Sequence, residues 1–281
     1  MSSLHPSDLQ DIEVRLFVQA MQLRYGYDFS GYSPASFKRR VRGATEHFGL
    51  ATISQLTERA LHDETVLTQL IARLSVPVTE MFRNPEVFQR LREDVLPWLS
   101  SFPQFNIWQA GCASGEEVYS LAILLEEAGL YDRALIYATD FNEHALDRAR
   151  EGIYAARDAR LFSENYQRAG GSGSLSDYYV AGYDHIKLDA RLKRNITFAN
   201  HNLTADGVFC EAHLILCRNV LIYFSDNLKD RVLTLFRDSL ARGGYLCLGN
   251  KESLIFSTLA DEFKPVSSGH AFYRLRSTNA V

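Results

Sequence analysis

The stretch from Asn106 to Leu121, NIWQAGCASGEEVYSL, constrains the fold more than any other part of the chain. An apolar run is followed by small residues that include Gly111 and Gly115, and then by apolar side chains at helical spacing. This order predicts a strand, a tight turn and a helix N-terminus, where the backbone can approach a ligand because glycine has no Cβ. A second apolar run, ALIYATD, ends at Asp140, and an acidic side chain at this strand tip can accept hydrogen bonds from ribose hydroxyls. The two segments together predict a doubly wound α/β sheet with a nucleoside site.

Two glutamates at the predicted helix start narrow the class of cofactor. Glu116 and Glu117 follow the turn. The helix dipole favours negative charge at this end, but a pyrophosphate placed beside the two carboxylates would be repelled. A cofactor with a ribose and cationic groups is therefore favoured over a dinucleotide, and S-adenosylmethionine, with its sulfonium and ammonium groups, fits. The late segments ARGGYLCLGNKESL and HAFYRL predict closing strands of the kind found in doubly wound methyltransferases.

Length and charge limit the classes of protein to which the chain can belong. The 281 residues suffice for two domains, and the net charge of −4 argues against a general nucleic-acid binder. No apolar run approaches the roughly 20 residues that span a bilayer, and the N-terminal residues lack the pattern of a secretion signal. We therefore expect a cytoplasmic protein without nucleic-acid partners or direct membrane insertion. Its scattered cysteines predict buried thiols and no metal site.

The chain before the glycine turn predicts a separate helical domain and a linker. Apolar residues recur at helical spacing through residues 1–75, and no strand pattern interrupts them. Residues 76–99 read as an extended linker followed by a helix. Asn84 and Pro85 predict the start of that helix, because asparagine caps exposed N–H groups and proline is tolerated in the first turn. The remaining residues, 100–281, form the expected sheet domain.

The second helix of the first domain carries a cluster of cations. Lys38, Arg39, Arg40 and Arg42 lie within five residues of one another. One reading is an ordinary solvated helix face. The other is a docking surface for an acidic partner, because long cations on a rigid helix concentrate a positive field even in an acidic protein. The residues alone leave both readings open.

Later segments predict an insertion and a further polar strand end. Between about residues 153 and 195 a glycine- and serine-rich loop is flanked by partly alternating segments, which predicts a small antiparallel β insertion. The apolar run AHLILC is followed by Arg218, Asn219 and Tyr223, and ligands of open α/β sheets bind at the carboxyl ends of strands. Asn202, after the run ITFAN, is similarly placed to contact an adenine edge.

These motifs resemble one known family. TEMFRNPEVF, AGCASGEEVYSLA, ATDFNEHALDRA, ANHNL and CRNVLIYF, in this order after a basic helical segment, are similar to the CheR family of chemotaxis-receptor methyltransferases. The similarity extends roughly over residues 9–275. It implies an S-adenosylmethionine-dependent O-methyltransferase that converts glutamate side chains of methyl-accepting chemoreceptors into methyl esters, with S-adenosylhomocysteine as the second product.

The resemblance also implies roles for single residues. Arg83 and Tyr223 match active-site positions, and Tyr223 corresponds to a tyrosine near the transferred methyl group. Pro77 stands where the family often has asparagine, which puts one polar contact to the cofactor in doubt. The positions that match cofactor contacts are Thr79, Arg83, Glu117, Asp140, Asn202, Leu203, Arg218 and Asn219.

Partners follow from the same resemblance. The glutamate-rich cytoplasmic helices of a receptor would make Lys38, Arg39, Arg40 and Arg42 a docking face. The β insertion resembles the subdomain with which some members bind a peptide at the receptor C-terminus, and the sequence does not decide whether it does so here. A non-catalytic module that binds S-adenosylmethionine remains an alternative, although Arg83 and Tyr223 argue against it. A small-molecule methyltransferase is another, but it would need neither the basic helix nor the insertion.

Overall fold

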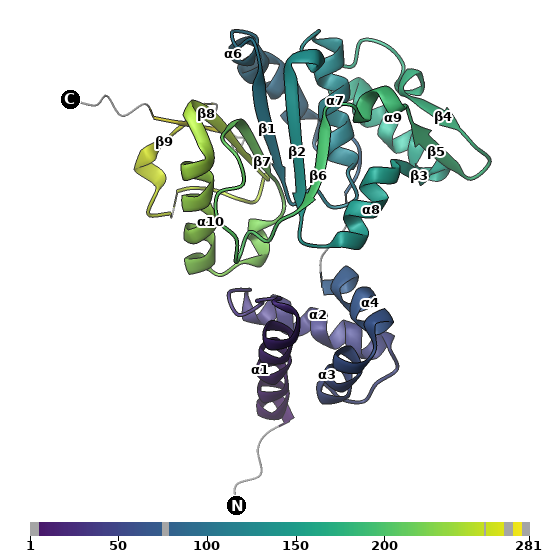
Figure 1. The fold of residues 1–281 in the computed structure, drawn as a ribbon, viewed down its shortest axis with the longest axis vertical. Helices are drawn as coiled ribbons and strands as arrows, with labels where there is room; N and C mark the ends of the chain where they lie inside the picture. The colour runs from purple at the N-terminus through teal and green to yellow at the C-terminus, as the bar shows by residue number, and fades with distance from the viewer. Residues whose placement is uncertain (1–5, 75–78, 256, 267–271, 277–281) are drawn as a thin grey trace, which may run out of the picture. The chain divides into compact units, whose positions relative to one another are not determined.

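The chain folds into two compact units. The computed structural model describes residues 6–74, 79–255, 257–266 and 272–276. One unit comprises Met1–Pro77 together with Ile222–Arg231, and the other comprises Val78–Leu221 and Val232–Val281. Figure 1 shows the fold with its helices and strands labelled. Among the described residues, no helix combines the length and the hydropathy that crossing a membrane requires.

The first unit is helical, as predicted. Pro34 occupies the first turn of the second helix, and the side chain of Thr52 caps the third by accepting a hydrogen bond from the Gln55 N–H. Apolar side chains at spacings of three and four residues meet in its core, where Phe17 and Val41 are fully buried. The helices are α1 (Pro6–Tyr25), α2 (Pro34–His47), α3 (Ile53–His62) and α4 (Glu64–Leu74).

A short segment from much later in the chain, Ile222–Arg231, completes this unit. The N–H of Ser33 donates to the carbonyl of Tyr223 at 2.9 Å, and the N–H of Ser225 donates to the carbonyl of Gly31 at 2.8 Å. A β-bridge between Tyr32 and Phe224 lies between these two bonds. Residues 222–231 therefore belong with the helical unit, although they directly follow a strand end of the sheet unit.

The second unit is built on a seven-stranded sheet with the order β6-β2-β1-β7-β8-β10-β9. The strands from β6 to β8 run parallel, and β10 is antiparallel to both of its neighbours. The chain leaves β1 on one side for β2 and β6 and returns on the other side to β7, so the strand order reverses beside β1. The strands are β1 (Phe105–Ala110), β2 (Ala134–Asp140), β6 (Ile196–Asn200), β7 (Ala212–Cys217), β8 (Leu240–Leu248), β9 (Phe263–Pro265) and β10 (Phe272–Leu275).

The central strands are buried and helices cover the sheet. Trp108 of β1 and Leu246 of β8 are fully buried, as expected for strands covered on both faces. The helices of this unit are α5 (Pro85–Arg90), a π-helical turn (Leu91–Val95), α6 (Leu96–Leu99), α7 (Glu116–Glu127), α8 (Glu143–Glu151) and α9 (Ala159–Arg168). The remaining helix, α10 (Asp226–Ser239), begins in the segment that joins the helical unit, and from Val232 on it belongs to the sheet unit.

The predicted antiparallel insertion is present as a separate small sheet. Its strands β3 (Ile153–Ala155), β4 (Tyr179–Ala181) and β5 (His185–Leu188) have the order β3-β5-β4 and are all antiparallel. They lie beside α9, on the opposite side of the sheet unit from β9 (Figure 1). The predicted fold class is thus confirmed: a helical N-terminal part precedes a doubly wound sheet that carries a β insertion.

Candidate active site

The turn between β1 and α7 lies at the position where the strand order reverses. Gly111 has a φ of 73°, and a Cβ added to it would lie 2.5 Å from Cγ2 of Val220, so only glycine fits. The N–H of Ala113 in this turn donates to Oδ2 of Asp140 at 2.9 Å. The N–H of Asn142 donates to Oδ1 of the same carboxylate, also at 2.9 Å. Asp140 therefore has a fixed orientation at the tip of β2.

The electrostatic environment of Asp140 suits a ligand that donates hydrogen bonds. Burial raises the pKa of this carboxyl, and the backbone N–H groups of Asn142, Ala113 and Phe141 oppose the shift. Hydroxyl groups donating to the carboxylate would add to that opposition and favour the ionised form.

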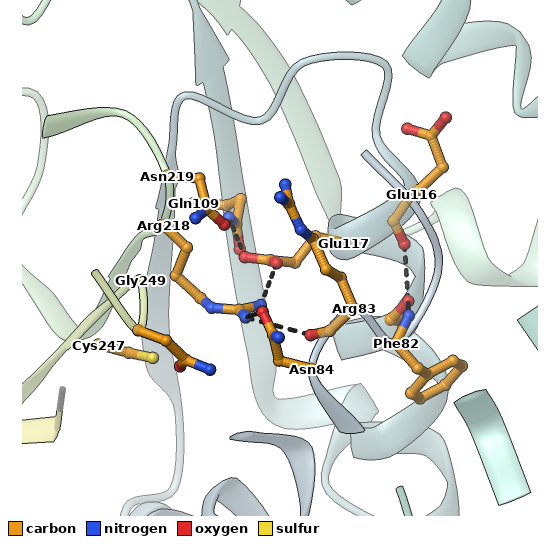
Figure 2. Close-up of polar contacts among 12 residues, drawn as sticks. Phe82, Arg83, Asn84, Gln109, Glu116, Glu117, Arg218, Asn219, Cys247 and Gly249 are labelled. Atoms are coloured by element: carbon orange, nitrogen blue, oxygen red, sulfur yellow. Dashed lines mark hydrogen bonds and ion pairs between the residues drawn. The ribbon is translucent and has the colours of Figure 1, made fainter. Parts of the chain in front are cut away.

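A buried ion pair joins three distant segments of the sheet unit. Nη1 of Arg218, just after β7, pairs with Oε2 of Glu117 on α7, and their side chains are only 1% and 9% exposed. Nη2 of Arg218 donates to Oδ1 of Asn84 at 2.8 Å and to the carbonyl of Arg83 at 3.1 Å. Oε1 of Glu117 accepts from Nε2 of Gln109 on β1 at 2.9 Å. Figure 2 shows these side chains converging on Arg218. The guanidinium thus fixes the linker turn against the sheet.

The linker turn has an unusual backbone conformation. Phe82 and Asn84 have φ values of 53° and 56°, in the left-handed region that non-glycine residues rarely adopt. The Phe82 N–H donates to Oγ of Ser120 at 2.8 Å, which anchors the turn to α7. The prediction that Asn84 caps the following helix is wrong, because its side chain makes no capping bond and instead accepts from Arg218. Arg83 lies between the two left-handed residues, and its side chain extends away from Arg218 (Figure 2).

A second carboxylate holds the turn after β7. Asn219 is also left-handed, with a φ of 62°. Oε2 of Glu252 accepts from the N–H of Asn219 at 3.0 Å and from the N–H of Gly249 at 2.6 Å, and Glu252 is buried. A Cβ on Gly249 would lie 2.7 Å from the same carboxylate oxygen. The role of Glu252 was not predicted, because the pattern of the segment GNKES is that of an ordinary turn.

The two glutamates at the start of α7 make different contacts. Glu117 faces Arg218, whereas the carboxylate of Glu116 points away from it (Figure 2). Both carboxylate oxygens of Glu116 accept from Oγ of Ser114, at 2.8 and 3.0 Å. Burial raises the pKa of Glu116 to about 7, against the opposing effect of these hydrogen bonds. No feature of the sequence around these two neighbours predicts the difference.

Comparison with known proteins identifies the family. Residues 77–272 match the model described as CheR methyltransferase, SAM binding domain, and residues 12–75 match the model described as CheR methyltransferase, all-alpha domain. The chain belongs to the CheR methyltransferase family. The resemblance inferred from the sequence is therefore confirmed. The family's first domain corresponds to the helical residues before the linker, and its second contains the glycine turn, Asp140 and Arg218.

Relatives of this CheR protein match over most of their length. Cher3 of Pseudomonas putida is 49% identical over 264 residues, which cover 94% of this chain and 97% of that protein. The chemotaxis protein methyltransferase of Listeria monocytogenes is 30% identical over 241 residues, covering 85% of this chain and 89% of that protein. The chemotaxis protein methyltransferase 1 of Vibrio cholerae is 28% identical over 276 residues, covering 92% and 94%. The CheR chain is accordingly a methyltransferase that uses S-adenosylmethionine.

The residues present fit this cofactor. Among the described residues, Oδ1 of Asn219, Oε1 of Gln109 and Nε of Arg218 are buried without a hydrogen-bond partner. Unsatisfied buried polar atoms are rare in proteins, and a bound polar ligand would account for them. Gln109 lies on β1, and Arg218 and Asn219 directly follow β7, the strand next to β1 in the sheet. Asp140 adds an acceptor at the neighbouring strand tip.

The other predicted cofactor residues lie in loops. Asn202 follows β6, and its side-chain oxygen accepts from the N–H and hydroxyl of Thr204, at 3.0 and 2.8 Å. Its amide N–H groups are therefore the part that can face a ligand. Leu203 is buried and Thr79 is half-buried. Pro77, at which the chain departs from its family, lies outside the described residues.

The predicted basic cluster does not form one uniform face. Lys38 pairs with Asp11 at 2.6 Å, and Arg39 and Arg42 are exposed. Arg40 is half-buried, and its guanidinium lies over the ring of Tyr223, with 3.9 Å between its Cζ and the ring centroid. Tyr223 therefore lies with the helical unit, whereas the other predicted active-site residue, Arg83, belongs to the sheet unit.

Proposed function

We propose that the protein transfers the methyl group of S-adenosylmethionine to glutamate side chains of methyl-accepting chemoreceptors, giving glutamate methyl esters and S-adenosylhomocysteine. The observation that carries this proposal is the match to both CheR domains in order, over residues 12–75 and 77–272. The chemotaxis protein methyltransferases of Listeria and Vibrio support it, because this chain covers most of each.

We assign the cofactor to the edge of the sheet where the strand order reverses. Asp140 would accept hydrogen bonds from the ribose hydroxyls, and Asn202 would donate its amide N–H to the adenine edge, with Leu203 supplying apolar contact. The unsatisfied Oδ1 of Asn219 would accept from a donor such as the ammonium group. Thr79, in the described end of the linker, would contribute a further polar contact. The bound group supplies a methyl carbon attached to a positively charged sulfur.

Glu117 and Arg218 would contribute mainly by holding the linker turn and less by direct contact with the cofactor. Nη1 of Arg218 pairs with Glu117 and its Nη2 bonds the linker turn, while the other carboxylate oxygen of Glu117 accepts from Gln109. The main contribution of the pair is therefore to hold the backbone of Arg83. Nε of Arg218, which lacks a partner among the described residues, is the atom left to meet the cofactor. The side chain of Arg83 would then pair with the cofactor carboxylate or orient the substrate carboxylate by a bidentate contact.

The reaction depends on positioning the two reactants more than on acid–base chemistry. A glutamate has a reference pKa near 4.3, so the substrate carboxylate is already ionised and no general base is required. One carboxylate oxygen forms a bond to the methyl carbon while the carbon–sulfur bond breaks, and the bonding pair stays on sulfur. Holding the two reactants in line is worth roughly 7–11 kcal/mol. Tyr223 would present its electron-rich ring or hydroxyl to the methyl sulfonium.

Two surfaces are candidates for the receptor. Arg39 and Arg42, with Lys38 beside them, would dock the glutamate-rich cytoplasmic helices of the receptor. The β insertion would take the receptor C-terminal peptide. β4 is an edge strand among the described strands, paired with β5, and its Val180 is 73% exposed. An exposed edge strand can add a peptide by β-augmentation. A partner of this kind would require the protein to act in the cytoplasm, where these receptor segments lie.

Methyl transfer to receptor-containing membranes tests the proposal. The full-length protein is incubated with the membranes and with S-adenosylmethionine labelled in its methyl group. We expect labelled receptor, and release of the label as methanol in mild alkali, because carboxyl methyl esters hydrolyse there and N-methyl groups do not. Membranes without receptor are the control. Tight cofactor binding with no transfer would favour the non-catalytic module, and alkali-stable label would exclude a glutamate ester.

A further inference from the structure

Arg40 differs from its neighbours on α2 in how its guanidinium is used. Nη1 donates to the carbonyl of Leu74 at 2.7 Å, and Nη2 donates to Oγ of Ser36 at 3.3 Å. The flat face of the group covers the ring of Tyr223, with Cζ 3.9 Å from the ring centroid. Two edges and one face of the guanidinium are therefore occupied. A planar group in this arrangement is a stacking partner, and lysine cannot replace it.

Tyr223 is held by the same unit through its backbone. Its carbonyl accepts from the N–H of Ser33, directly before α2, at 2.9 Å. The next residue, Phe224, forms a β-bridge with Tyr32 and packs against its ring at a centroid distance of 5.1 Å. The helical unit thus fixes the backbone from the carbonyl of Tyr223 through Phe224. Among the described side chains, Arg40 is the one that lies over the Tyr223 ring.

The exposed arginines of α2 make no comparable contact. Within the described part of the chain, Nη2 of Arg42 lies 3.9 Å from Oε1 of Glu46, one turn further along the helix, and the Arg42 side chain is 55% exposed. Burial lowers the pKa of the Arg40 guanidinium, with the nearby tyrosines Tyr223 and Tyr32 opposing the shift, which is a further sign that this group faces protein and not solvent. One helix therefore carries two kinds of arginine.

We propose that Arg40 is a positioning residue for Tyr223, which orients the tyrosine ring for methyl transfer and does not dock the substrate. The proposal rests on the proposed function, because the role of Tyr223 beside the methyl group comes from the CheR resemblance. It corrects the expectation that Arg40 belongs to the docking face. It also means that α2 holds the tyrosine through one arginine and the acidic partner through its others, so docking and ring orientation share one rigid element.

Substitutions that separate charge from stacking test the proposal. Arg40→Lys keeps the charge and loses the planar stack, and Arg40→Ala loses both. A cation–π contact that is partly desolvated contributes about 1–2 kcal/mol, which corresponds to a loss of roughly five- to thirtyfold in kcat. We expect both variants to lose kcat to this extent, with KM for the receptor and the cofactor Kd within twofold of the parent. Arg42→Ala is the contrast, and we expect it to raise KM for the receptor with kcat unchanged.

A double-mutant cycle then assigns the loss to the tyrosine. In a Tyr223→Ala background, Arg40→Ala should cause little further loss of kcat, because the ring that it orients is gone. Losses that multiply independently would overturn the proposal. So would an Arg40→Lys variant with the parent's kcat, paired with an Arg40→Ala variant that only raises KM, since that pattern is the one expected of a docking charge.

A measurement without turnover keeps this test separate from the proposed function. 3-Fluorotyrosine is placed at position 223, and its ¹⁹F NMR signal is recorded in the full chain. We expect Arg40→Lys to shift or broaden the signal, because the ring loses its stacked partner, while Arg42→Lys leaves it unchanged. An unchanged ¹⁹F signal would overturn the positioning role whether or not the parent methylates receptors. A parent without transferase activity but with the expected ¹⁹F response would instead contradict the proposed function alone.

Discussion

Two arginines of the chain, Arg218 in the sheet unit and Arg42 in the helical unit, are used in opposite ways. The side chain of Arg218 is 1% exposed and bonds Glu117, Asn84 and the backbone of Arg83. The side chain of Arg42 is 55% exposed, and its Nη2 lies 3.9 Å from Oε1 of Glu46, whose side chain is 72% exposed. The charge of Arg218 fixes the backbone of the linker turn, and the charge of Arg42 faces solvent. Substitutions in the two units should therefore affect different measured quantities.

The largest expected effect is on stability in the sheet unit. Arg218→Ala leaves Glu117 buried with Gln109 as its remaining partner among the described residues, and removing one member of a buried ion pair costs about 3–5 kcal/mol. Denaturant unfolding should show this loss in the free energy of unfolding. Arg42→Ala is the matched control and should stay within about 0.5 kcal/mol of the parent.

A test of this prediction is whether Arg218 and Glu117 contribute to stability as a coupled pair. In a double-mutant cycle with Glu117→Gln, the combined variant should lose less stability than the two single variants added together, because each single change already breaks the pair. Strict additivity, or a loss for Arg218→Ala no larger than that of Arg42→Ala, would contradict the role given to Arg218.

A second prediction concerns Glu116, a buried glutamate that accepts hydrogen bonds from Ser114. Its pKa is raised from 4.5 to about 7, so the native state holds this proton more tightly than the unfolded chain does. The resulting stability is fully present below pH 4.5 and is lost as the pH rises through 7. Glu116→Gln cannot ionise. It should therefore gain stability relative to the parent between pH 5 and pH 8, by up to about 3 kcal/mol.

Thermal or denaturant unfolding across this pH range checks the sign. The Glu143→Gln variant is the control, because Glu143 is exposed at the start of α8 and should show no such relative gain. A Glu116→Gln variant whose stability runs parallel to that of the parent at every pH would show that the carboxyl is not held protonated by burial.

A third prediction concerns cofactor affinity. Hydrogen bonds to a charged group contribute about 1.5–3 kcal/mol, so Asp140→Ala should weaken binding of S-adenosylhomocysteine roughly ten- to hundredfold. Asp140→Asn, which keeps one acceptor, should fall between this variant and the parent. Isothermal titration calorimetry measures both. Undiminished affinity in Asp140→Ala would show that the ribose does not bind at this strand tip.

The smallest predicted effect is on the exposed face of α2. Exposed charge pairs contribute about 0.2–1 kcal/mol each, so the double variant Arg39→Ala with Arg42→Ala should raise KM for the receptor only a few-fold. The effect should shrink as salt is added, because exposed charges are screened. Stability and cofactor affinity should not change. A salt-independent KM would show that these arginines do not steer the acidic partner.

Much of this architecture could be predicted from local sequence signals. The glycine turn after an apolar run gave the β1–α7 connection, the run ending at Asp140 gave the neighbouring strand, and the loosened segment after Gly152 gave the β insertion. These features depend on periodicity and on the backbone freedom of glycine, which are visible within a short window of sequence.

The partners of the charged side chains could not be predicted in this way. Arg218 and Glu117 are 101 residues apart in the chain, and no sequence feature near either residue predicts that they pair. The side chain of Asn84 accepts from Arg218 and does not cap the helix, so local rules for helix starts predicted the wrong role. Tyr223 follows a sheet strand but packs with α2, because a bond to Ser33 and the stack under Arg40 hold it there. Such contacts are decided by the tertiary fold.

Peptide mapping of a methylated receptor tests the central claim most directly. After reaction with the full-length protein and S-adenosylmethionine, the receptor is digested and analysed by tandem mass spectrometry, with and without prior alkaline treatment. The account predicts a mass increase of one methylene unit on glutamate side chains of the cytoplasmic helices, and its loss after alkali. Methyl groups that survive alkali, or that map to residues other than glutamate, would contradict it.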